Sequence, residues 1–307
     1  MHRISRRSFT KSTLAAAGLI AAGGSAALAA PANIIRRRIP SSGELIPIMG
    51  LGTNRYGVGE SADARAPLQN TLERFHELGG TVIDTAPGYR TSESVLGDLV
   101  SDLGIRDDLF LATKVDREGG REDSLAQMRD SARRLQSGTI DLMQVHSLRD
   151  WENTIPLLQE LRQDGGFRYI GVTTSRSSQY AEMEKAMTRH DLDFIQVDYS
   201  LEQREAAERL LPLAAGRGMA VMLNRTFGGG RIFEAVGGQP LPEWARELQI
   251  TSWAQFLLKY ALSHPAATVA IPGMTKARHV EDNFGAARGP MPDAGQRRQM
   301  EAFFDAL

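Results

Sequence analysis

Short apolar runs alternate with longer amphipathic segments along the chain from Leu45 onward. The short runs are nearly continuous in apolar residues, which is typical of parallel strands buried on both faces. Eight of them are predicted to be strands: Ile46–Thr53, Thr81–Ala86, Leu109–Val115, Ile140–Ser147, Arg168–Thr174, Phe194–Ser200, Met219–Arg225 and Ala267–Pro272. The segments between them are long enough for right-handed crossovers. Four of these are predicted to be helical: Ala66–Leu78, Ser92–Leu103, Arg121–Leu135 and Thr154–Gln163.

Eight strand–helix units in one chain of this length predict an α/β fold, a (β/α)₈ TIM barrel. The alternative is a doubly wound sheet, but no G-x-G-x-x-G follows the first strand. Two segments break the alternation. Ile34–Pro47 contains a Ser41-Ser42-Gly43 turn between extended runs, which predicts an N-terminal β-hairpin closing the barrel floor. Thr226–Pro242 is a glycine-rich loop after the seventh strand, and it is either a cofactor lid or a variable surface loop.

The first 29 residues are expected to form a separate signal peptide. Arg3, Arg6, Arg7 and Lys11 precede an apolar, alanine-rich run, with no acidic residue among them. The Ser5–Lys11 stretch resembles the twin-arginine consensus, and Ala27-Leu28-Ala29 fits a cleavage site. We therefore expect residues 1–29 to direct export by the twin-arginine (Tat) machinery to the periplasm. Residues 30–307 would form the barrel domain, without a membrane span in the mature form. A disordered basic N-terminus is the alternative.

Composition narrows the chemistry that remains. The formal net charge is −1, and losing the four basic residues of the leader would leave −5. Such a charge offers no electrostatic basis for a nucleic-acid partner. Cysteine is absent, which excludes disulfides, thiolate nucleophiles and Cys-ligated metals. The histidines show no clustered spacing typical of metal ligands, so no metal site is predicted.

Four polar side chains stand where a barrel carries its chemistry, at the C-terminal ends of adjacent strands. Asp84, Lys114 and His146 end the second, third and fourth predicted strands, and Tyr89 follows five residues after Asp84. Each has an ordinary explanation when taken alone: Asp84 as a helix N-cap, Lys114 as a rim charge, Tyr89 as a loop aromatic and His146 as a core histidine. Their joint placement at one barrel mouth predicts a catalytic site.

The sequence around these residues is similar to that of the aldo-keto reductase family. Ile83-Asp84-Thr85-Ala86-Pro87-Gly88-Tyr89 followed by Ser92-Glu93-Ser94-Val95-Leu96-Gly97 resembles the family's signature around its catalytic Asp and Tyr. Further matching segments are Gly50-Leu51-Gly52-Thr53, Ala112-Thr113-Lys114-Val115, Asp141–Ser147 and Gly171-Val172-Thr173. The likeness runs from about Ile34 to Arg288.

The resemblance implies an NAD(P)H-dependent oxidoreductase that reduces an aldehyde or ketone to an alcohol. Tyr89 would act as general acid, and a phenol's pKa of about 10 would be lowered by cationic Lys114. Asp84 would hold the Lys114 ammonium, and His146 would donate a hydrogen bond to the carbonyl oxygen. The alternative is a non-catalytic nucleotide-binding sensor or regulatory protein on the same barrel.

By position, the resemblance also implies a cofactor-binding set that favours NADP(H) over NAD(H): Thr53, Asp84, Thr173, Thr174, Gln196, Asn224, Arg225, Gly273, Lys276, Asp282 and Asn283. Lys276 or Arg278 could pair with an adenosine 2′-phosphate, or either could be a solvated cation. The sequence departs from the common family pattern at Thr174, Asn224, Arg90 and Asn54. Asn224 removes an aromatic stacking surface, and Arg90 with Asn54 predicts a polar, cationic substrate side. A small-molecule carbonyl substrate is therefore expected, without bulky apolar groups.

Overall fold

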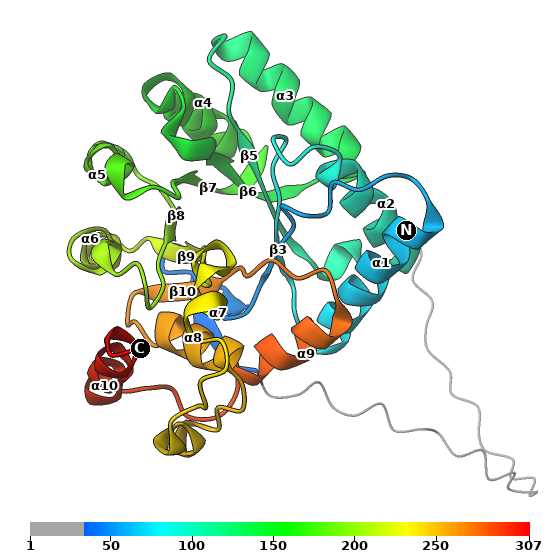
Figure 1. The fold of residues 1–307 in the computed structure, drawn as a ribbon. Coiled ribbons are helices and arrows are strands. Elements are labelled where there is room, and N and C mark those ends of the chain that lie inside the picture. The colour runs from blue at the N-terminus through cyan, green and yellow to red at the C-terminus, as the bar shows by residue number, and fades with distance from the viewer. Residues whose placement is uncertain (1–33) are drawn as a thin grey trace, which may run out of the picture. The chain divides into compact units, whose positions relative to one another are not determined.

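Eight parallel strands form the centre of the protein in a computed structural model that describes residues 34–307 (Figure 1). The predicted signal peptide lies outside the described residues. The strands pair in chain order: β3 (Leu51–Gly52), β4 (Val82–Asp84), β5 (Phe110–Val115), β6 (Ile140–Val145), β7 (Phe167–Thr173), β8 (Phe194–Asp198), β9 (Ala220–Asn224) and β10 (Ala267–Ala270). Parallel bridges from Met49 to Ala270 and from Gly52 to Gly273 join the two edges. The predicted barrel is confirmed.

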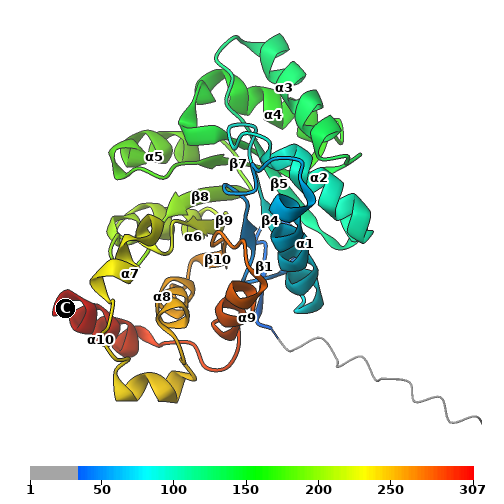
Figure 2. The same cartoon turned by 45° about the vertical axis from the view of Figure 1, so that its right-hand side comes forward.

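Helices surround the strands in both views (Figures 1 and 2). They are α1 (Ala62–Glu77), α2 (Ser92–Leu103), α3 (Arg121–Arg134), α4 (Trp151–Gln163), α5 (Tyr180–Arg189), α6 (Leu210–Gly216), α7 (Arg231–Ala235), α8 (Trp253–Leu262), α9 (Ala277–Gly285) and α10 (Ala294–Asp305). Short 3₁₀ turns are η1 (Arg106–Asp108), η2 (His146–Leu148), η3 (Ser177–Gln179), η4 (Glu205–Ala207), η5 (Gly228–Gly230) and η6 (Glu243–Leu248). The four predicted helices are confirmed, although α1 begins four residues early because Ser61 caps it.

The barrel interior has an apolar lower part and a polar upper end. Phe110, Tyr169 and Phe194 pack together inside it, with ring centroids 5.7–5.9 Å apart. Successive inward positions on β5 are Phe110, Ala112 and Lys114, since side chains alternate between the two faces of a strand. Lys114 therefore lies at the last inward position, above an apolar layer. The same alternation brings polar side chains to the C-terminal ends of β4, β6, β8 and β9.

The predicted hairpin closes the opposite end of the barrel. β1 (Arg36–Arg38) and β2 (Leu45–Pro47) pair antiparallel, and Ile39 and Ile46 join the apolar cluster inside the barrel. The Tyr169 hydroxyl contacts Ser42 at 2.7 Å and Glu44 at 2.6 Å. The predicted first strand, Ile46–Thr53, is wrong in its extent, because its first two residues belong to β2 and its barrel part is only Leu51–Gly52.

The glycine-rich segment after β9 is partly helical. η5 and α7 occupy 228–235, and Gly228, Gly229 and Gly230 have φ angles of 56°, 74° and 106°. Such angles favour glycine, which explains this run of three. Among the described residues, no helix is both long and apolar enough to cross a membrane.

Candidate active site

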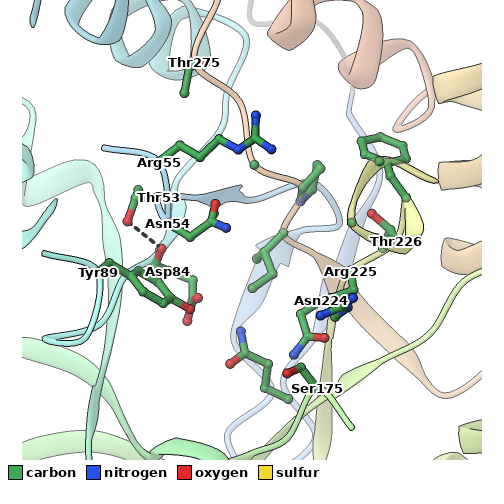
Figure 3. Close-up of a pocket in the computed structure, with 18 of the residues that line it drawn as sticks. Thr53, Asn54, Arg55, Asp84, Tyr89, Ser175, Asn224, Arg225, Thr226 and Thr275 are labelled. Atoms are coloured by element: carbon green, nitrogen blue, oxygen red, sulfur yellow. Dashed lines mark hydrogen bonds between the residues drawn. The ribbon is translucent and has the colours of Figure 1, made fainter. Parts of the chain in front are cut away.

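A cavity of about 710 Å³ opens at the C-terminal ends of the strands. Side chains around its wall come from loops on opposite sides of the barrel, with Tyr89 facing Asn224 and Arg225 across it (Figure 3). Thirteen of the predicted site residues line this one cavity: Asp84, Tyr89, Lys114, His146, Thr53, Thr173, Thr174, Gln196, Asn224, Arg225, Gly273, Asp282 and Asn283. Lys276 does not line the cavity; it is exposed at the start of α9.

Asp84 and Lys114 form a buried ion pair at the base of the cavity. Lys114 Nζ lies 2.8 Å from each carboxylate oxygen of Asp84 and donates a third hydrogen bond of 2.6 Å to the Thr85 carbonyl. The two side chains are only 1% and 3% exposed. Burial alone would lower the pKa of Lys114, but the facing Asp84 and Tyr89 raise it above its usual value. The ammonium is therefore held charged, and Asp84 is not a helix cap, since α2 begins at Ser92.

Neighbouring polar groups fix this pair in place. Gln144, which pairs with Lys114 across β5 and β6, donates a hydrogen bond from Nε2 to Asp84 at 3.3 Å. Thr53 donates its hydroxyl to the Asp84 carbonyl at 3.0 Å (Figure 3). Ser92, at the first turn of α2, donates to the Thr53 carbonyl at 2.9 Å. These bonds link the loop that carries Tyr89 to the first strand.

Tyr89 lies against the charged pair. Lys114 Nζ is 5.3 Å from the centroid of its ring. The Lys114 charge is the largest influence on the Tyr89 pKa and lowers it, but burial and the Asp84 carboxylate together outweigh it. The net pKa is therefore above the usual 10.0. The expected net lowering is wrong, because burial of the phenol and the counter-ion of the lysine both favour the neutral phenol.

His146 stands beside Tyr89 on η2, directly after β6. The two rings meet edge to face, with centroids 6.0 Å apart. His146 Nδ1 lies 3.4 Å from Oδ2 of Asp116, a residue that the sequence analysis did not single out. That hydrogen bond is the main reason why the pKa of Asp116 falls to about 2. No local motif could have identified Asp116, because Asp116 follows β5 whereas His146 follows β6.

The wall opposite Tyr89 offers hydrogen-bonding groups that no atom of residues 34–307 uses. Asn224 Nδ2 donates to the Thr174 carbonyl at 3.0 Å, whereas Asn224 Oδ1 and Thr226 Oγ1 are buried without a partner. Thr174 itself is engaged, since its hydroxyl bonds Gln179 Oε1 at 2.7 Å. A buried polar atom left unpaired costs about 1–3 kcal/mol. A ligand that carries amide and hydroxyl groups would fit this wall.

Arg55 and Arg225 are arginines that line the cavity, whereas Arg90 does not. Arg90 has a φ of 57° and packs against Gly57, and it does not line the cavity. Arg55 lines it together with Asn54 (Figure 3), and forms no ion pair within residues 34–307. The expectation that Arg90 faces the substrate is therefore wrong, because its side chain packs against Gly57 outside the cavity lining.

Aromatic and titratable residues from two later segments complete the cavity wall. Phe227 and Phe233, on the glycine-rich segment, have ring centroids 5.0 Å apart, and both line the cavity. His279, on α9, also lines it, whereas Arg278 does not. The segment of Thr226–Pro242 thus contributes to the cavity, as a lid would. Its apolar contribution was missed because a glycine-rich sequence carries no periodicity.

Comparison with known proteins gives one consistent family. A family model described as the aldo/keto reductase family matches residues 48–298. The methylglyoxal reductase YeaE of Escherichia coli is 28% identical over 255 residues, covering 81% of this chain and 88% of that protein. Aldo-keto reductase YhdN of Bacillus subtilis is 31% identical over 191 residues, which cover 57% of this chain and 56% of that protein. The match therefore spans little more than half of that second relative.

Solved structures agree with the sequence relatives. An aldo-keto reductase of Bacillus halodurans in its holo form superposes with a TM-score of 0.71 at 25% identity, covering 88% of this chain and 96% of that one. An aldo/keto reductase of Klebsiella pneumoniae, solved with NADP and acetate, gives a TM-score of 0.70 at 26% identity, covering 85% and 93%. The similarity thus includes the whole barrel.

Proposed function

The chain belongs to the aldo/keto reductase family, and from that membership we propose that it reduces an aldehyde or ketone to an alcohol with NADP(H). The observation that carries the proposal is the position of Tyr89 beside the buried Lys114–Asp84 pair, with His146 on its other side. This arrangement puts a proton donor, a fixed cation and a hydrogen-bonding group at one end of a cavity.

When bound, the nicotinamide supplies the hydride that attacks the carbonyl carbon. Tyr89 donates the proton that the resulting alkoxide needs. Its pKa above 10.0 keeps the phenol protonated at neutral pH. The charge of Lys114 stabilises the phenolate that remains after transfer, and Asp84 keeps that charge in place. His146 donates a hydrogen bond to the carbonyl oxygen, and one such donor contributes about 3–4 kcal/mol to transition-state stabilisation.

The wall opposite Tyr89 would hold the nicotinamide. The unpaired Asn224 Oδ1 would accept from its carboxamide, and Gln196 and Thr173 line the same cavity. Gly273, Asp282 and Asn283 also line the cavity and would hold the adenosine. Arg55 and Arg225 line the cavity and would be available to the cofactor's phosphates, whereas Lys276 and Arg278 do not line it. The solved relative with bound NADP supports NADP(H) over NAD(H).

The cavity favours a small polar carbonyl substrate. Asn54 lines it near Tyr89 and gives this side a polar character, whereas Arg55 extends toward the loop of Thr275 (Figure 3). One relative is a methylglyoxal reductase, so small oxoaldehydes are the first compounds to test. Bulky apolar ketones should be poor substrates, because they would leave these polar groups desolvated without partners.

A further part of the proposal concerns location. The twin-arginine-like segment Ser5–Lys11 supports export to the periplasm by the Tat machinery. Because that route carries folded proteins and free NADPH is scarce outside the cytoplasm, we propose that the enzyme travels with its cofactor bound. Absorbance of the exported protein in the reduced-nicotinamide band tests this. An exported protein that contains no cofactor and binds neither NADP nor NAD would refute it.

The proposed activity is tested with the protein lacking residues 1–29. Titration with NADPH and with NADH, followed by fluorescence, should give a smaller Kd for NADPH. A panel of small polar and large apolar carbonyls is then offered to the loaded enzyme. Oxidation of NADPH that depends on a small carbonyl supports the proposal. Tight cofactor binding without turnover of any carbonyl would favour the sensor instead.

A further inference from the structure

The carboxylate of Asp116 faces Nδ1 of the His146 ring. Oδ2 of Asp116 lies 3.4 Å from His146 Nδ1, and the two side chains are 19% and 21% exposed. Both lie against the backbone before Tyr89: a Cβ added to Gly88 would stand 3.6 Å from Asp116 Oδ2 and 3.8 Å from His146 Cε1. The pair is thus part of the wall next to the proposed general acid.

Asp116 is itself held in one orientation. Gln127, a buried residue of α3, donates from Nε2 to Asp116 Oδ1 at 2.7 Å and accepts from the Asp116 backbone N–H at 2.9 Å. Only Oδ2 is left for His146. With its pKa at about 2, Asp116 is a carboxylate throughout the working pH range, and an ionised carboxylate can only accept hydrogen bonds.

The carboxylate that faces Nδ1 determines which ring nitrogen of His146 carries a hydrogen. Because Asp116 can only accept, Nδ1 must bear a hydrogen. In neutral imidazole the other nitrogen, Nε2, then has a lone pair and cannot donate. Nε2 becomes a donor only when the ring is an imidazolium, which carries a hydrogen on both nitrogens.

We propose that Asp116 is a positioning residue that makes the imidazolium form of His146 the hydrogen-bond donor to the substrate's carbonyl oxygen. The inference rests on the proposed function. Tyr89 still supplies the transferred proton in the proposed reaction. Neutral His146 would turn a lone pair toward the carbonyl oxygen, so carbonyl reduction requires protonated His146 and falls as pH rises through its titration.

Other charges near His146 act on the same equilibrium. Arg149, just beyond η2, is close enough to Asp116 to lower that group's pKa. Lys114 lies beyond the Tyr89 ring and is balanced by Asp84. Tyr89 is neutral, because its pKa lies above 10.0. Asp116 is thus the negative charge that directly contacts the ring.

Asp116→Asn removes this charge with little change of shape. The imidazolium loses its counter-ion, so His146 should titrate about one pH unit lower, a modest shift because the pair is partly exposed. The matched control is Glu118→Gln, which removes an equal charge two residues away at an exposed position. Long-range electrostatics alone would give both variants the same small shift, whereas direct contact predicts a shift in Asp116→Asn only.

Two measurements on the cofactor-loaded protein test the inference. The first is an NMR titration of the histidine ring signals, with that of His146 assigned by its loss in His146→Gln. The second is the pH profile of kcat/KM for carbonyl reduction. Both the NMR midpoint and the alkaline fall of kcat/KM should move down by about one pH unit in Asp116→Asn and stay unchanged in Glu118→Gln. Ionisation of Tyr89 cannot cause a fall at pH 5–8, because its pKa lies above that range.

The failures are distinguishable. An NMR midpoint that is equal in Asp116→Asn and the wild type overturns the pairing, even in an active enzyme. If the NMR midpoint shifts but the pH profile of kcat/KM does not, the requirement for the imidazolium form of His146 is refuted. If the His146 midpoint differs between the wild type and Asp116→Asn but the wild type turns over no carbonyl, the proposed function is refuted and the pairing stands.

Discussion

Replacing Asp84 by Asn should leave the Lys114 ammonium buried without a counter-ion. The substitution keeps the size of the side chain, and its amide oxygen can still accept one hydrogen bond. The charge that faced Lys114 at 2.8 Å through two oxygens is lost. The Thr85 carbonyl, 2.6 Å away, remains as a neutral acceptor. Lys114 must then stay charged in a buried site without a counter-ion or lose its proton.

The size of the effect follows from burial. With the two side chains 1% and 3% exposed, solvent cannot replace the missing charge. Removing one member of such a pair typically costs about 3–5 kcal/mol of unfolding free energy. For a domain of this size, that corresponds to a Tm lower by roughly 6–10 °C. A neutral Lys114 would also support the Tyr89 phenolate less, so kcat should fall by at least about tenfold.

Denaturant unfolding of four proteins measures this cost: the wild type, Asp84→Asn, the double variant Asp84→Asn/Lys114→Met, and Asp102→Asn. Asp102 is exposed, so its substitution should change stability by less than about 0.5 kcal/mol. The double variant should be more stable than Asp84→Asn, because it removes the stranded charge. The reasoning would be refuted if the unfolding free energy of Asp84→Asn lay within about 1 kcal/mol of the wild-type value, or if the double variant were less stable than Asp84→Asn.

Three further predictions follow from other parts of the structure. Lys259 is fully buried, and burial lowers its pKa from 10.5 to about 8. Between these two pH values the unfolded chain therefore binds more protons than the folded protein. The wild type should gain unfolding free energy relative to Lys259→Met as pH rises from about 8 to 10.5, and an unchanged difference would disprove this. Asn224→Ala should raise the Kd for NADPH about tenfold by loss of one hydrogen bond, as measured by fluorescence titration. At Gly228 an added Cβ would stand 2.2 Å from Glu202 Oε2 at a φ of 56°, so Gly228→Ala should lower the Tm, whereas Gly216→Ala, with open space around it, should not.

Much of the site could be predicted because barrel geometry converts sequence position into spatial position. A polar residue at the end of a buried strand must lie at the barrel mouth, and this rule alone brings Asp84, Lys114 and His146 together. The hairpin was predictable from its turn residues. The start of β3 was missed, because Ile46–Leu51 resembles one apolar run although Pro47 marks a break within it.

What sequence reasoning missed depends on contacts between distant segments. Asp116 meets His146 across 30 positions of the chain. Arg90 was expected at the cavity and Arg55 was not singled out, because the sequence does not report the positive φ of Arg90. The net pKa of Tyr89 depends on how deeply the phenol is buried and on the Asp84 counter-charge, neither of which a motif reports.

The central claim is that Tyr89 donates the proton in an NADP(H)-dependent carbonyl reduction. A single-turnover measurement with pre-bound NADPH and a small oxoaldehyde, comparing the wild type with Tyr89→Phe, tests it most directly. We predict that cofactor Kd is unchanged and that the rate of NADPH oxidation falls by about 10²–10⁴-fold, the usual contribution of a general acid. A Tyr89→Phe enzyme that oxidises NADPH at the wild-type rate, or a wild type that binds NADPH and never oxidises it, would contradict the account.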